Sequence, residues 1–142
     1  MRQLTDHIVS GDQAVQLEIV VTDAPGAGGA CHEYRIRGIF SKEGMVPLSK
    51  LTNVEVLEDG RVCGDLCAVS FQDGPIKEFG VNGITQEALL AIVIDRLRSF
   101  QAGHYACEEN RVALTYCEAA LKALQTRTLA RIKRGVEGTN EK

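Results

Sequence analysis

The first half of the chain alternates between apolar and polar residues in short runs that turn residues separate. Alternation with a period of two, in segments rich in β-branched side chains, is typical of β-strands. The candidate strands are residues 15–22, 32–40, 54–57, 61–63, 66–71 and 76–79. Asp59-Gly60 lies between the third and fourth of these and is a hairpin signal. We therefore predict an antiparallel β domain over residues 1–83.

The pattern changes to a helical period after Gly83. Thr85 is a suitable N-cap, and Glu87 lies in the first turn, where the helix dipole favours an acid. The first helix is expected to run to about Phe100, and residues 89–94 within it are apolar on nearly every side. Such a helix needs cover on more than one face, which favours contact with the β domain and with a second subunit.

A second helix is predicted from about Cys107 to Arg134, after a break at Gly103. It stops at Gly135, a residue suited to the position after a helix. Its apolar positions recur in alternating steps of three and four residues, at Leu114, Cys117, Leu121 and Leu124. This spacing indicates the seam of an antiparallel hairpin. About 28 residues with a rise of 1.5 Å each span roughly 40 Å, more than a small β domain covers, so self-association is expected.

Together these elements predict an α+β fold, with the β domain over residues 1–83 and a helical hairpin with a basic end and a tail over residues 84–142. A length of 142 residues with 44% hydrophobic content suits one compact unit. No stretch approaches the roughly 20 apolar residues of a membrane span, and the N-terminus has no apolar signal-peptide core. We expect a cytoplasmic protein that contacts no membrane.

Five cysteines in a chain without an export signal favour reduced thiols over a disulfide framework. Cys63 and Cys67 are close in sequence, but no second pair or HxxxH motif follows, so no metal site is predicted. Cys31 and His32 are adjacent, and on a strand they would point to opposite faces, which prevents a nucleophile–base pair. We therefore expect no catalytic residue and no cofactor.

The glycine-rich loop at residues 24–30, which includes Gly28, has two interpretations. It does not match GxGxxG, it lacks the GK[ST] ending of a P-loop, and it leads into a strand instead of a helix. As a mononucleotide-binding motif it is therefore weak. A loop without bulky side chains that closes over a ligand remains an open alternative.

The net charge of −3 is unevenly distributed along the chain. Residues 1–80 carry 12 acids and 7 bases, whereas residues 81–142 carry 7 acids and 9 bases. This is too few bases for DNA or RNA, which need a broad basic face, but enough for a small anion. Arg127, Arg131 and Arg134 share one face of the second helix. They can neutralise the helix dipole or clamp a phosphate, and the sequence leaves both interpretations open.

Three further features have both a structural and a binding interpretation. Phe100, beside the hairpin bend, is either a core side chain or a platform for a ligand. Asn110 lies in the first turn of the second helix, where it caps, contacts solvent or lines a site. Gly138-Thr139 is either part of a frayed tail or part of an anion site made by backbone amides.

Several segments, in order and spacing, resemble the phage anti-Thoeris sponge family. They are Pro25-Gly26-Ala27-Gly28-Gly29-Ala30 through Tyr34, Phe71-Gln72-Asp73-Gly74-Pro75-Ile76, Gly80-Val81-Asn82-Gly83, Leu89-Leu90-Ala91 through Asp95-Arg96-Leu97, Phe100-Gln101, Cys107-Glu108-Glu109-Asn110 and Arg134-Gly135-Val136-Glu137-Gly138-Thr139. The similarity covers about residues 15–140. The hairpin is also similar to that of the smaller phage sponges that act against CBASS immunity.

This resemblance implies a protein that binds, without cleaving it, a cyclic ADP-ribose isomer made by bacterial TIR-domain enzymes. It also implies a homo-oligomer, most simply a hexamer, in the cytoplasm of the infected bacterium. Some members of the family bind cyclic di- or trinucleotides at separate sites. Two alternatives stay open: an enzyme that degrades the same signal with His32 or a carboxylate as base, and an anti-defence module that binds a protein.

Roles for individual residues follow from the resemblance alone. Phe100 would stack on the adenine, Asn110 would line the same pocket and Arg127 would bind phosphate. Arg35 and Gly28 would contribute to this pocket from the β domain. A second site, for a cyclic oligonucleotide, would contain Arg134, Gly138 and Thr139.

Overall fold

The computed structural model describes residues 1–9 and 16–142, so residue 15, the first of a predicted strand, lies outside the described residues. The chain divides into two compact units, Met1–Ser70 and Phe71–Lys142. The sequence placed this division later, between residues 83 and 84. The difference arises because residues 71–83 are bonded to the helical part: the amide of Gln72 donates to the carbonyl of Ile84 at 3.0 Å.

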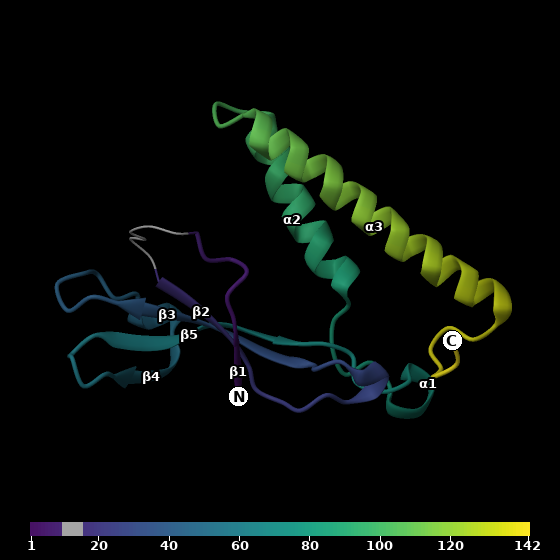
Figure 1. Cartoon of the computed structure of the whole chain (residues 1–142), viewed down its shortest axis with the longest axis horizontal. Coiled ribbons are helices and arrows are strands. Elements are labelled where there is room, and N and C mark those ends of the chain that lie inside the picture. The colour runs from purple at the N-terminus through teal and green to yellow at the C-terminus, as the bar shows by residue number, and fades with distance from the viewer. Residues whose placement is uncertain (10–15) are drawn as a thin grey trace. The chain divides into compact units, whose positions relative to one another are not determined.

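The first unit is an antiparallel sheet of five strands in the order β1-β2-β3-β5-β4 (Figure 1). The strands are β1 (Arg2–Leu4), β2 (Gln16–Val21), β3 (Glu33–Phe40), β4 (Thr52–Val56) and β5 (Val62–Ser70), with short 3-10 turns at Ala27–Gly29 and Leu48–Lys50. Val21, Leu51 and Cys63 are its buried apolar side chains. Burial raises the pKa of the Cys63 thiol, so this thiol stays protonated. The predicted antiparallel β domain is confirmed.

The predicted hairpin around Asp59-Gly60 is confirmed, but one strand was divided wrongly. The amide of Leu57 donates to the carbonyl of Arg61 at 2.8 Å, and Gly60 has a φ of +85°. The predicted strands 61–63 and 66–71 form a single strand, β5. It runs through Gly64, where an added Cβ would lie 3.2 Å from Leu51, so this glycine serves close packing instead of ending the strand.

Two irregularities in the sheet meet at Asp65. The register shifts between Ile36 and Arg37 on β3, and again between Thr52 and Glu55 on β4. Within the second irregularity, Asn53 has a φ of +49°. Asp65 is 4% exposed and accepts hydrogen bonds from Arg37 Nε at 3.0 Å and Asn53 Nδ2 at 2.8 Å. The two bulges thus direct polar side chains onto one buried carboxylate.

The second unit contains three helices, α1 (Ile76–Phe79), α2 (Gln86–Gln101) and α3 (Glu108–Arg134). The predicted strand at residues 76–79 is wrong, since this segment is the single turn α1. Pro75 precedes it and cannot donate to a sheet ladder, while Gly80 ends it with a φ of +70° and donates to the carbonyl of Ile76 at 2.8 Å. An amide side chain, Gln72, then closes the loop by donating to the carbonyl of Gly80 at 2.8 Å.

Helices α2 and α3 form the predicted antiparallel hairpin (Figure 1). Thr85 caps α2 by accepting the amide of Ala88 at 3.2 Å, and Gly135 ends α3 in the left-handed conformation. The half-buried or buried positions of α3 repeat in steps of four and three, and those of α2 follow the same steps with Leu89 in addition. They are Asn110, Leu114, Cys117, Leu121, Leu124, Thr128 and Arg131 on α3, and Glu87, Leu89, Leu90, Ile94, Leu97 and Gln101 on α2.

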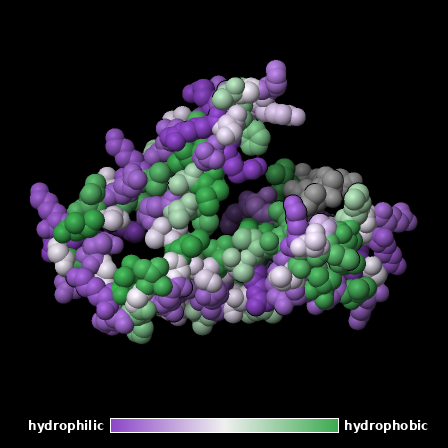
Figure 2. Space-filling view, turned by 180° about the vertical axis from the view of Figure 1, so that it is seen from behind, coloured by the Kyte–Doolittle hydropathy of each residue, from purple (hydrophilic) through white to green (hydrophobic). Residues whose placement is uncertain are grey.

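Apolar side chains also lie outside this seam. Ile92 and Val93 on α2 are 59% and 44% exposed, and Leu129 and Ile132 on α3 are 65% and 56% exposed. Figure 2 shows apolar patches interrupting the polar surface of the chain. The self-association expected from the sequence would cover such positions, and it stays a prediction.

Candidate functional site

The bend between α2 and α3 holds two of the predicted binding residues, Phe100 and Asn110. The Phe100 ring contacts Tyr105 edge to face, with the ring centroids 6.3 Å apart. The guanidinium of Arg96 lies over the Phe100 ring, 5.5 Å from its centroid. Asn110 Nδ2 is 3.5 Å from the carbonyl oxygen of Tyr105. A cationic and aromatic cluster suited to stacking a planar base therefore surrounds Phe100.

Local hydrogen bonds fix the shape of this bend. Gln101 Nε2 donates to the carbonyl of Cys107 at 3.2 Å, and the Cys107 amide donates to Gln101 Oε1 at 3.0 Å. Cys107 is the N-cap of α3 and accepts the amide of Asn110 on its sulfur at 3.4 Å. The cap uses the backbone amide of Asn110, while its side-chain amide contacts the carbonyl of Tyr105. The sequence analysis gave no role to Arg96, Gln101 or Tyr105, although Arg96 and Gln101 lie in segments that carry the resemblance.

Arg127 lies elsewhere on α3 and lines a cavity of about 830 Å³ within the second unit. Its side chain is 63% exposed, and its Nη2 is 3.9 Å from Oε1 of Glu87. The walls combine one guanidinium and two carboxylates, those of Arg127, Glu87 and Glu137, with apolar, hydroxyl and amide groups, namely Gln72, Ile76, Val81, Gly83, Thr85, Gln125, Thr128 and Leu129. The exposed guanidinium can donate hydrogen bonds to one phosphate group.

One chain does not bring Arg127 together with Phe100 and Asn110. Arg127 follows Asn110 by 17 residues in the same continuous helix. At 1.5 Å per residue the two positions are roughly 25 Å apart. A pocket that contains all three side chains thus requires more than one copy of the chain.

The residues predicted for a second site lie at the end of α3, which is Arg134, and in the tail that follows it. Gly138 has a φ of +78°, and its carbonyl accepts the amide of Lys77 at 3.4 Å. The amide of Thr139 donates to the carbonyl of Val136 at 3.1 Å. Arg134 donates to the carbonyl of Lys142. The tail is therefore folded back in an ordered turn beside the last cations of the helix.

Arg35 and Gly28 belong to the other unit, and their part in ligand binding stays a prediction. The Arg35 side chain is 49% exposed, with Nη1 3.6 Å from Oδ2 of Asp65. It lines a cavity of about 610 Å³ on the sheet. Gly28 lies in the 3-10 turn with a φ of +74°, and nothing would touch an added Cβ there. Glycine is therefore favoured at position 28 by the positive φ of the loop, and not by a neighbour that would clash with a side chain.

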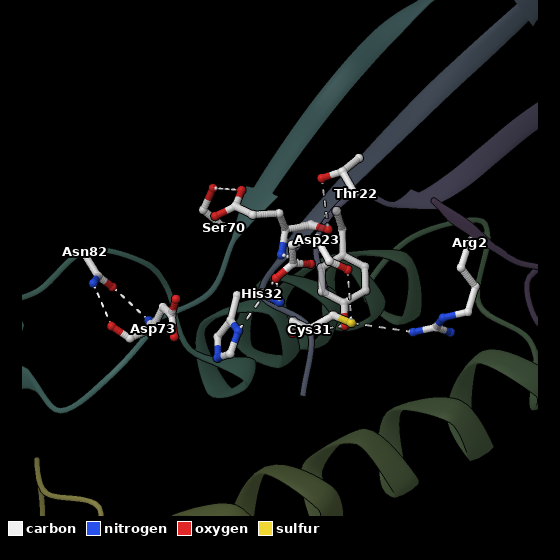
Figure 3. Close-up of polar contacts among 10 residues, drawn as sticks. Arg2, Thr22, Asp23, Cys31, His32, Ser70, Asp73 and Asn82 are labelled. Atoms are coloured by element: carbon white, nitrogen blue, oxygen red, sulfur yellow. Dashed lines mark hydrogen bonds and ion pairs between the residues drawn. The ribbon is translucent and has the colours of Figure 1, made fainter. Parts of the chain in front are cut away.

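Asp23 holds the ends of the glycine-rich loop together (Figure 3). Its carboxylate accepts the amides of His32 at 2.7 Å and Glu33 at 3.0 Å, and these bonds lower the pKa of Asp23. Cys31 Sγ contacts the carbonyl of Asp23 at 3.5 Å and Arg2 Nη2 at 4.0 Å. His32 is 6% exposed, with Nδ1 3.8 Å from Asp23 Oδ2. Both side chains thus contact Asp23, and these contacts give the segment a structural role.

Residues 1–9 and 16–142 contain no group of three or more His, Cys, Asp or Glu side chains placed to hold a metal ion. Within the same described ranges, no helix has the length and apolar character that crossing a bilayer requires.

Comparison with known proteins connects the hairpin to a family. Residues 65–128 match the model of the Acb2/Tad1 hairpin domain. A relative named Thoeris anti-defense 1, from Bacillus phage SBSphiJ7, is 51% identical over 79 residues. This stretch covers 56% of the present chain and 56% of the relative. The resemblance drawn from the sequence to phage anti-Thoeris proteins is thereby confirmed, and residues 65–128 are similar to the Acb2/Tad1 hairpin domain family.

Proposed function

We propose that this chain is a phage counter-defence protein that binds and sequesters a cyclic ADP-ribose-type signal without cleaving it. The observation that carries the proposal is the hairpin match, together with a relative named for its action against Thoeris defence. Phe100, Asn110 and Arg127, to which we assign adenine and phosphate recognition, all fall within the matched segment.

The geometry supports a pocket shared between copies of the chain. The Phe100–Asn110 cluster and Arg127 lie far apart along the hairpin, and the proposed ligand carries both a base and phosphates. We assign the base to the bend of one copy and a phosphate to Arg127 of a neighbouring copy. This arrangement would also explain the exposed Ile92 and Val93 on α2, and it agrees with the homo-hexamer expected from the sequence.

The binding free energies of individual contacts also favour a pocket to which several residues contribute. Stacking supplies roughly 1–3 kcal/mol per base, and a hydrogen bond to a charged group about 1.5–3 kcal/mol. A nanomolar trap needs about −12 kcal/mol. One ring and one arginine are insufficient, so tight sequestration requires a closed site that assembly forms in advance.

A second site for a cyclic di- or trinucleotide is proposed at Arg134, Gly138 and Thr139. Its support is the ordered turn of the tail, where Gly138 has a positive φ and Thr139 is bonded to Val136. Glycine adopts such a φ without steric cost, so Gly138 allows the tail to form this turn.

Recovery of the ligand tests the proposal. The protein is incubated with cyclic ADP-ribose isomers, separated from free nucleotide, denatured by heat, and the released nucleotide is analysed by mass spectrometry. Intact recovery in stoichiometric amount is the expected result. An altered product would instead identify an enzyme that degrades the signal, with His32→Ala as the first variant to examine. No retained nucleotide would favour an anti-defence module that binds a protein.

A further inference from the structure

Arg131 lies on the basic face of α3 between Arg127 and Arg134, but its guanidinium is turned to the tail. Nε donates to Glu137 Oε2 at 2.9 Å. Nη2 donates to two backbone carbonyls, those of Val136 and Thr139, each at 3.0 Å. Nη1 donates to the carbonyl of Glu141. The side chain is 22% exposed. Four of its N–H donors are therefore used inside the chain, and little of the group remains for a ligand.

The backbone of the tail is arranged to receive these bonds. Gly135, with a φ of +73°, donates to the carbonyl of Ile132 at 3.0 Å, and Val136 donates to the carbonyl of Arg131 at 3.0 Å. This closure of the helix end reverses the chain direction and turns the following carbonyls back along the helix. The planar fork of arginine can serve several fixed acceptors at once, whereas lysine presents a single ammonium group.

Arg134 differs from Arg131 although it lies less than one turn away. Among the described residues, its side chain has one hydrogen bond, to the carbonyl of Lys142. The residue is exposed. Two arginines of one helix face are therefore engaged in different ways, one inside the chain and one largely at the surface.

We propose that Arg131 is a positioning residue that holds Gly138 and Thr139 in place to receive the phosphates of a cyclic oligonucleotide, without contacting those phosphates itself. This inference rests on the proposed second site. Under this proposal Arg131 holds the tail loop in place, whereas Arg127 and Arg134 bind ligand.

The test compares Arg131→Ala, Arg131→Lys and Glu137→Gln with Lys133→Ala, which removes an exposed cation of the same last turn and serves as the control. Amide hydrogen exchange measures the order of residues 136–141, and calorimetry measures the affinity for cyclic tri-adenylate and cyclic di-guanylate. Thermal melts verify that each variant is folded. Glu137→Gln keeps the tail backbone bonds and provides a milder variant should Arg131→Ala melt early.

Both Arg131 variants are expected to exchange the tail amides at least tenfold faster and to bind the cyclic oligonucleotide at least tenfold more weakly. Lys133→Ala should stay within twofold of the wild type, and cyclic ADP-ribose binding should be unchanged in Arg131→Ala, Arg131→Lys and Lys133→Ala. Full affinity in Arg131→Lys would show that only the charge matters and would overturn the proposal. Unchanged exchange in Arg131→Ala would also overturn it.

Failure of the second site itself is distinguishable. In that case the wild type binds neither cyclic oligonucleotide, and the loop that Arg131 holds is not a ligand site, while binding of cyclic ADP-ribose is still measured independently.

Discussion

Phe100 has 37% of its surface exposed, and this value separates its two interpretations. A core phenylalanine would cost about 3–5 kcal/mol of stability when replaced by alanine. The ring instead lies at the bend with one edge on Tyr105 and Arg96 beside it. Part of the ring is therefore available to a planar ligand.

Phe100→Ala is expected to weaken cyclic ADP-ribose binding by roughly 1–3 kcal/mol, because a stacking surface is lost. Its melting temperature should fall by only a few degrees. Calorimetry and thermal melts on the same preparation check both values. Tyr116→Ala, which removes an aromatic ring that is 71% exposed on α3, is the control. A strongly lowered melting temperature of Phe100→Ala together with unchanged affinity would show that Phe100 is a core side chain.

Asp23 predicts a dependence on pH. The amides of His32 and Glu33 lower its pKa in the folded state, so its carboxylate stabilises the fold above the unfolded pKa of about 4. This contribution is lost as the pH falls through the lower, folded pKa. The melting temperature of Asp23→Asn should therefore lie below that of the wild type at neutral pH, and the difference should disappear in acid. Asp6→Asn, at an exposed position of the same unit, should show no such convergence.

At the scale of elements, local signals predicted the helices well. The N-cap Thr85 and the terminal Gly135 act through backbone geometry within a few residues, and the seam of α3 extends over enough turns for its period to be visible. The segment at 76–79 is four residues long, which is too short to show a hydrophobic period. The flanking residues Pro75 and Gly80 favour a helical turn there over a strand. The break assigned near Gly64 failed because that glycine serves tertiary packing against Leu51.

The N-terminal cap of α3 can be made more stable by a substitution. Cys107 caps the helix with a sulfur, a weak acceptor, at 3.4 Å from the amide of Asn110. Cys107→Ser should stabilise the protein by about 0.5–1 kcal/mol, because a hydroxyl oxygen is a better cap. Thermal or urea unfolding measures this, with Cys67→Ser at an exposed strand position as the control. Equal effects of the two substitutions would contradict the capping explanation.

In the sheet, the carboxylate of Asp65 joins the two bulges. Asp65→Ala should cost about 3 kcal/mol, because Arg37 loses its buried partner and Asn53 its acceptor. Glu55 contacts the same arginine at 3.1 Å but its side chain is 56% exposed, so Glu55→Ala should cost less than about 1 kcal/mol. Urea unfolding of both variants makes the comparison. Similar losses would show that burial of Asp65 is not the cause.

At the scale of the whole molecule, the sequence predicted self-association. The roles of Phe100, Asn110 and Arg127 came from the family resemblance, and they stay a prediction. The helical rise alone was sufficient to separate Asn110 from Arg127, and the structure confirms that α3 is unbroken between them. No local sequence pattern identifies the surface of another copy that completes the pocket.

Mixing of variants tests the shared pocket. Phe100→Ala and Arg127→Ala should each bind cyclic ADP-ribose poorly alone. When the two are unfolded together and refolded, or co-expressed, mixed assemblies should regain part of the binding, because some pockets then combine an intact Phe100 with an intact Arg127. Calorimetric stoichiometry measures the recovered sites. A mixture that binds no better than its components would place both residues in separate sites or in one chain.

The alternating three- and four-residue seam of α2 and α3 also restricts how the hairpin can change in length during evolution. An insertion of one or two residues in either arm would rotate every later side chain out of the seam. A pair of seven-residue insertions, one in each arm, would restore the contacts and lengthen the hairpin by about 10 Å. Viable length variants should therefore occur in whole heptads, and each step would move the Phe100 bend further from the Arg127 cavity without disturbing either.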